Sequence, residues 1–175
     1  MTGHHVNEQL SHLVPVSVEI LLLRADPAGA WRYRRIVTSL DRGENPDQAV
    51  RRAGGLTAEA TSTVVHSTSW RYQPEGQVVL TYAVCPDPAA HLPAIALTDF
   101  QLVRGSAPSA PSPEHLQVEN VVAHALRHLA FLVLTDPVVG EALTRDPALA
   151  AGFDALKRNA VPLGVAGGLR PVGER

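Results

Sequence analysis

Apolar residues occupy every second position at the beginning of the patterned part of the chain. Valine or isoleucine stands at positions 14, 16, 18 and 20, separated by proline or polar residues, and a run of leucines follows. Because successive side chains of a strand point to opposite faces, this alternation predicts a strand that enters the core. Pro27 and Gly29 predict a turn, and residues 31–37 predict a returning strand. The first unit is therefore expected to be a β-hairpin.

A short helix and a second hairpin are expected next. Asn45 before Pro46 is typical of a helix N-cap with proline at the first helical position, and Gly54-Gly55 ends the pattern, so this helix falls within residues 41–56. Segments 61–71 and 77–85 are rich in Val, Thr, Tyr and Trp, with turn residues at 74–76 between them. Residues 95–103 predict a further short strand.

The last third of the chain is predicted to be helical. A linker rich in proline and serine, residues 106–113, precedes a long segment with a broad apolar face at helical spacing. Asp136-Pro137 and Asp146-Pro147 each place a capping residue before proline, so two shorter helices are expected to follow, ending near Asn159.

These elements predict one domain of the α/β (α+β) class, since 175 residues suit a single core. A mixed, twisted sheet is expected to carry the first helix on one face and the long helix on the other, followed by a helical extension. The predicted domain is 13–160, comprising sheet and first helix (13–105), linker (106–113) and C-terminal helices (114–160). Residues 1–12 and 161–175 are predicted to be a flexible lead-in and tail.

Charge and cysteine content narrow the class of protein. Lys and Arg total 15 against 17 Asp and Glu, with no long run of like charge, so nucleic-acid binding is disfavoured. The apolar stretches 14–23 and 125–134 are shorter than the roughly 20 residues of a membrane span, and neither a span nor a signal peptide is expected. A lone cysteine, Cys85, indicates a reducing, cytoplasmic compartment and is expected to be a buried, inert thiol.

Residues 43–52, GENPDQAVRR, resemble the motif of the Nudix hydrolase family. In that family the motif reads glycine, five residues, glutamate, seven residues and then R-E-U-x-E-E-x-G-U, where U is a bulky aliphatic residue. Glu44 stands at the first glutamate position, and Arg52 stands at the arginine position. With the strands on either side, the resemblance covers residues 14–85 and implies a Nudix-like fold.

The glutamates of the family's motif helix are absent from this chain. The resemblance implies that they would hold Mg²⁺, which neutralises a diphosphate and activates water. Ala53 replaces the glutamate after the arginine, Leu56 and Thr57 replace the glutamate pair, and Thr38 replaces the opening glycine. A gap that aligns Gly55 with the motif's last glycine does not restore the pair. No metal or cofactor is therefore expected.

The leading hypothesis is a non-catalytic Nudix-like domain that binds a small ligand or a protein partner through the vestigial active-site cleft. Glu44 then acts as a favourable charge beside a helix N-terminus, and Arg52 is a solvated charge or a ligand-binding residue of the cleft. An open, polar cleft would favour a small ligand. A cleft filled by side chains such as Leu56 and Trp70 would favour a protein partner.

The alternative is a divergent hydrolase of nucleoside diphosphate derivatives that holds Mg²⁺ with relocated carboxylates. His124 or His128 would be its base. This alternative requires the carboxylates to lie within about 5 Å of one another around one pocket. The candidate carboxylates are Glu19, Asp41, Glu44 and Glu59.

Two further clusters carry polar side chains. His124 and His128 stand four residues apart on the long helix, a spacing that lets two imidazoles face one metal, but no further ligand accompanies them. A polar helix face is the simpler interpretation, on which Arg127 could receive an anion or a partner. Trp70 and Arg71 could stack on a ring and pair with an anion, whereas a Trp70 that fills the core or caps the sheet is the simpler expectation.

A third hypothesis is an interaction or assembly subunit, including a homodimer. It rests on the apolar long helix and the alanine-rich helices after it. The partners expected from the sequence are thus a small molecule or a protein, and neither nucleic acid nor a membrane.

Overall fold

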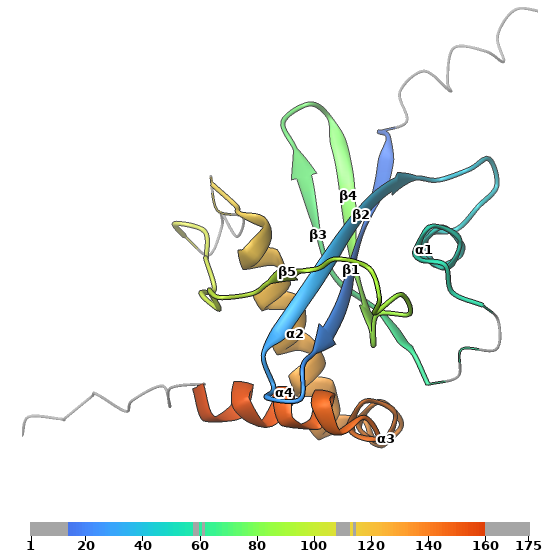
Figure 1. Cartoon of the computed structure of the whole chain (residues 1–175). Helices are drawn as coiled ribbons and strands as arrows, with labels where there is room; N and C mark the ends of the chain where they lie inside the picture. Colours follow the sequence, from blue (N-terminus) through green and yellow to red (C-terminus); the bar gives the residue numbers. More distant parts are fainter. Residues whose placement is uncertain (1–13, 58–59, 61, 108–112, 114, 160–175) are drawn as a thin grey trace, which may run out of the picture.

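The computed structural model describes residues 14–57, 60, 62–107, 113 and 115–159. Within them, helices cover both faces of one mixed sheet (Figure 1), which confirms the predicted fold class. The sheet has five strands in the order β3-β4-β1-β2-β5. Strands β1 and β4 are parallel, and the other neighbours are antiparallel. The predicted lead-in and tail, and most of the linker, lie outside the described residues.

The first hairpin, β1 (Val16–Ala25) and β2 (Trp31–Ser39), forms the centre of the sheet. Strand β1 lies between β2 and β4 and is buried at every position from 17 to 23. Ile20 and Leu22 pack on the face covered by α1, whereas Leu21 and Leu23 pack on the opposite face. Burial on both faces explains why the alternating pattern gives way to consecutive leucines.

Helix α1 (Pro46–Gly54) begins and ends as its sequence predicts. The Asn45 side chain accepts a hydrogen bond from the backbone N–H of Gln48, and the Gln48 side chain accepts one from the backbone N–H of Asn45. This capping box satisfies amides that the helix itself leaves unpaired. Gly55 follows with φ of 70°, the left-handed conformation that favours glycine at a helix end. Ala49 and Val50 pack against the sheet.

The second hairpin consists of β3 (Val64–Gln73) and β4 (Gln77–Cys85), and β3 is one edge of the sheet. A register shift lies between Ser67 and Ser69. Strand β5 (Ile95–Ala96) is much shorter than the strand predicted over 95–103, because only two residue pairs join it to β2.

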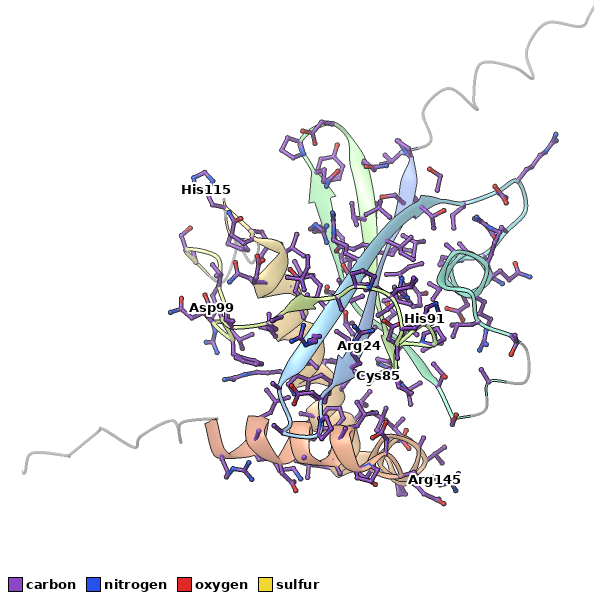
Figure 2. The ribbon with its side chains drawn as sticks, in the orientation of Figure 1. Arg24, Cys85, His91, Asp99, His115 and Arg145 are labelled. Carbon is purple, nitrogen blue, oxygen red and sulfur yellow. The ribbon has the colours of Figure 1, made fainter. Side chains whose placement is uncertain are left out.

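The loop between β4 and β5 is held to the sheet by a buried carboxylate. Asp87 accepts two hydrogen bonds from Arg34, at 2.8 and 2.7 Å, and lies 3.6 Å from Arg24. Arg24 also donates to the carbonyl oxygens of Ala90 and Leu92. Figure 2 shows Arg24 and the buried Cys85 close to this end of the sheet.

Helix α2 (Val118–Thr135) covers the sheet face opposite α1 and begins a few residues later than predicted. It is longer than the apolar stretch 125–134, and by length and composition alone it is the one described helix that would suit a membrane span. Its inner face, including Leu126 and Leu129, is buried in the core under the sheet.

Helices α3 (Pro137–Thr144) and α4 (Pro147–Asn159) complete the helical extension. The Asp136 side chain accepts from the backbone N–H groups of Val138 and Val139, which confirms the predicted cap. Helix α4 covers one end of the core. There the rings of Phe153 and Trp31 pack edge to face, with their centroids 5.0 Å apart.

Candidate functional site

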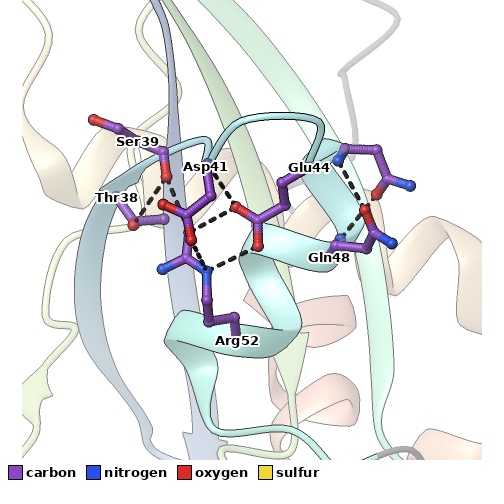
Figure 3. Close-up of polar contacts among 7 residues, drawn as sticks. Thr38, Ser39, Asp41, Glu44, Gln48 and Arg52 are labelled. Atoms are coloured by element: carbon purple, nitrogen blue, oxygen red, sulfur yellow. Dashed lines mark hydrogen bonds and ion pairs between the residues drawn. The ribbon is translucent and has the colours of Figure 1, made fainter.

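Glu44 and Arg52, the residues that carry the family resemblance, bind each other (Figure 3). Nε of Arg52 lies 2.8 Å from Oε1 of Glu44, and Nη2 lies 2.7 Å from Oε2. The same Nη2 donates to the carbonyl oxygen of Ser39, and Oε2 of Glu44 accepts from the backbone N–H of Asp41. These contacts fasten the end of β2 and the following loop to α1.

This arrangement makes the motif remnant a structural clamp. Hydrogen bonds from Arg52 and from the backbone of Asp41 lower the pKa of Glu44 to about 2. Arg52 also lies 3.3 Å from the Asp41 carboxylate, and its side chain is 42% exposed, so it is a solvated charge that is also paired. Leu56, just after the helix, packs against the apolar cluster between α1 and the sheet.

The carboxylates that a divergent hydrolase would need do not converge. Asp41 and Glu44 surround Arg52, whereas Glu19 pairs with other arginines on the opposite sheet face. Among the described residues, no group of three or more His, Cys, Asp or Glu side chains is placed to hold a metal ion. Glu59, the fourth candidate, lies outside the described residues.

Glu19 is a fully buried carboxylate at the centre of the sheet. Its Oε1 accepts a hydrogen bond from Nε of Arg35 at 2.7 Å. Its Oε2 accepts from Nη1 of Arg71 at 2.6 Å and from the Thr81 hydroxyl at 3.0 Å. Burial alone would raise the pKa of Glu19, but the hydrogen bonds from Arg71 and Arg35 outweigh it and lower the pKa.

The Glu19 cluster has a net positive charge, because one carboxylate faces two guanidinium groups. Nη1 of Arg71 also donates to Thr81, at 3.0 Å. Within the part of the chain that the structure describes, Nε and Nη2 of Arg71 have no hydrogen-bond partner. The cluster thus holds Arg71 in one orientation while leaving N–H donors for another acceptor.

Arg71 lies in the wall of a pocket of about 730 Å³, called here the β3–α2 pocket. One wall is residues 69–74 of β3 and its turn, and the other comprises residues 102–104 and the beginning of α2. The lining residues are Ser69, Trp70, Arg71, Tyr72, Gln73, Pro74, Leu102, Val103, Arg104, Pro113, Leu116, Asn120, Val121 and His124.

The arginine and histidine side chains of the β3–α2 pocket suit an anion. Arg71, Arg104 and His124 line it, and none of its described lining residues is an aspartate or a glutamate. Arginine donates to carboxylate or phosphate oxygens in a planar fork, and a cleft lined by one sign of charge concentrates counter-ions. The apolar side chains of Leu116 and Val121 border the same space.

The pocket unites candidates that the sequence leaves apart. Trp70 and Arg71 come from β3, and His124 comes from α2. Arg52 is not part of it, because α1 lies on the other face of the sheet. Arg127 and His128 follow on α2 but are not among the lining residues.

Trp70 does not fill the core, which was one of the two positions predicted for it. Its side chain is 69% exposed, and the core tryptophan is Trp31. Trp70 pairs with Leu80 on the sheet face that carries α1. Helix α1 packs over β1, β2 and β4, so the outer strand β3 has no cover at Trp70.

His128 joins α2 to β3. Its Nε2 lies 3.0 Å from Nε2 of His66, and the two rings are stacked with centroids 4.9 Å apart. One imidazole must donate and the other accept, so this contact requires at least one neutral ring. Burial, followed by the charges of His66 and His124, lowers the pKa of His128. Of the predicted polar face, His124 and Arg127 are exposed.

Two other expectations concern Cys85 and assembly. Cys85 is fully buried, as expected, and burial raises the pKa of its thiol. Phe131, Leu134 and Val138 are 60, 69 and 78% exposed on α2 and α3. They offer an apolar surface, and a homodimer stays a prediction.

Arg35 and Arg104 are site residues that the sequence analysis did not single out. A glutamate within an apolar central strand requires counter-charges. Hairpin pairing sets Arg35 opposite Leu21, which shares a sheet face with Glu19, so the position of Arg35 could have been predicted. The sequence does not predict the position of Arg104, because that position depends on the path of the chain between β5 and α2.

No family model, curated protein or solved structure matches this chain. The relationship to Nudix proteins therefore stays a prediction that rests on residues 43–52 and on the order of the elements around them.

Substitution Glu19→Gln tests the buried cluster. It leaves Arg35 and Arg71 without their counter-charge, so we expect the free energy of unfolding to fall by about 3 kcal/mol, measured by chemical denaturation. The matched variant Glu44→Gln disrupts an exposed pair and should cost much less. Equal losses in the two variants would show that Glu19 is not the central charge.

Acid titration tests the Glu44–Arg52 clamp. The pKa of Glu44 is lowered in the fold from 4.5 to about 2, so its stabilising contribution is complete above pH 4.5 and disappears as the pH falls towards 2. We expect Glu44→Gln to flatten the pH dependence of the unfolding free energy in that window. A wild-type slope retained by the variant would refute the clamp.

Proposed function

We propose that this chain is a non-catalytic Nudix-like domain of the cytoplasm that binds an anionic ligand in the β3–α2 pocket. One observation carries the proposal: Arg71, Arg104 and His124 line a pocket of about 730 Å³ that none of the described carboxylates lines. This volume is large enough for a small organic molecule. The proposal moves the binding site from the vestigial cleft to the opposite sheet face.

The Glu19 cluster supports this assignment because it prepares Arg71 for a ligand. A long arginine side chain loses rotamer freedom when it binds, and that cost falls when the guanidinium is already held. Nη1 of Arg71 lies 2.6 Å from Oε2 of Glu19, and the Glu19 carboxylate is itself inaccessible to solvent. Removing water from the pocket would further strengthen its attraction for an anion.

The absence of catalysis follows from the motif residues themselves. The motif helix has no glutamate between Arg52 and Gly55, and Glu44 has both carboxylate oxygens engaged by Arg52. Without several carboxylates at one place, Mg²⁺ has no set of oxygen ligands on this helix.

Binding of a small anion tests the proposed site. In an NMR titration, N-acetylglutamate should shift the backbone amide signals of residues 69–73 and of the first turns of α2, whereas neutral N-acetylglutamine amide should not. Arg104→Gln should weaken this binding roughly five-fold, because it removes one exposed charge, and Arg145→Gln on the distant helical extension should not. An anion affinity that Arg104→Gln leaves unchanged, or no binding at all, would refute the proposed site.

A hydrolysis assay tests the non-catalytic claim. With Mg²⁺ or Mn²⁺ and a panel of nucleoside diphosphate derivatives, we expect no release of phosphate or nucleoside monophosphate above the protein-free rate. The reason is the missing set of metal ligands on α1. Turnover that is present in the wild type and lost in Glu44→Gln would show that the motif helix still catalyses.

A further inference from the structure

The β3–α2 pocket runs along the edge of a strand. Residues 69–74 line it without a gap. Successive residues of a strand point to opposite faces, so a pocket over one face would be lined by every second residue. Contact with all of them means that the backbone edge of β3 forms the wall.

That edge has only part of the protection that sheet edges usually carry, namely a register shift and the inward-facing Arg71. Strand β3 ends the five-stranded sheet of the described residues, and its sequence VVHSTSWRYQ contains no Lys, Pro, Asp or Glu. Natural edges are commonly guarded by such residues, which discourage pairing with another chain. The register shift lies between Ser67 and Ser69, before the stretch that borders the pocket.

Both faces beside this edge have uncovered side chains. On the α2 side, Arg71 lines the pocket together with Arg104 and His124. On the α1 side, Trp70 and Tyr72 are 69 and 59% exposed. A strand added to the edge would place alternate side chains over both faces.

We propose that the β3–α2 pocket receives an extended acidic segment of a partner protein, which pairs with the outer edge of β3 as an additional strand. This inference rests on the proposed function and names its ligand. Backbone hydrogen bonds to β3 supply the affinity, and the side chains on each face supply the selectivity. One face of the segment carries a carboxylate to Arg71 and Arg104, and the other covers Trp70.

The charges favour an acidic partner over a second copy of this chain. A second β3 would bring another Arg71 and no carboxylate to the edge. The apolar Leu116 and Val121 beside His124 fit an apolar side chain two positions from the carboxylate on the same face of the segment.

Selection from a displayed library of random seven-residue peptides, with the full chain as target, tests this inference. We expect enrichment of peptides in which Asp or Glu alternates with other residues. A synthetic copy of the most enriched peptide should slow hydrogen exchange of backbone amides in residues 69–73. Trp70→Ala and Arg104→Gln should each weaken its binding at least ten-fold, and Arg145→Gln should leave it unchanged.

The exchange measurement separates the peptide inference from simple anion binding. N-acetylglutamate should respond to Arg104→Gln but should not slow hydrogen exchange of the backbone amides in residues 69–73, because only an added strand pairs with the backbone of β3. No acidic enrichment, no protection of β3, or indifference of the peptide to Trp70→Ala would overturn the strand inference. N-acetylglutamate binding would then still support the proposed function, and its failure as well would overturn both.

Discussion

The buried charge of Glu19 is the constraint on which the sheet and the pocket both depend. A carboxylate inside the central strand is tolerable only when cations and hydrogen-bond donors surround it. Arg35 from β2, Arg71 from β3 and Thr81 from β4 meet this need, so one side chain joins all strands around β1. The same contacts hold Arg71 at the pocket wall. Under the proposed function, stability and ligand recognition would share one cluster.

The two faces of the sheet differ in how their charges are paired. On the α1 face, Glu44 and Arg52 neutralise each other and fasten the loop that leads into the helix. On the α2 face, arginine charge exceeds carboxylate charge at the pocket. Under the proposed function, α1 and its flanking loop would serve structure, and the opposite face would serve recognition.

Local chemistry made most of the fold predictable from the sequence. Asn45-Pro46, Asp136-Pro137 and Asp146-Pro147 each mark a helix start because their capping contacts lie within a few residues. The pocket was less predictable, because Trp70, Arg104 and His124 meet only through the order of the strands and the path into α2. Trp70 in particular looked like a core residue, since nothing in its own neighbourhood reveals that β3 is an edge beyond the reach of α1.

The central claim is that anions bind at the β3–α2 pocket and not at the motif remnant. One binding isotherm, with N-acetylglutamate as ligand, compares Arg104→Gln with Arg52→Gln after both variants are shown to be folded. The account predicts weaker binding in Arg104→Gln and wild-type binding in Arg52→Gln. The reverse order would contradict it and return the binding site to the α1 face.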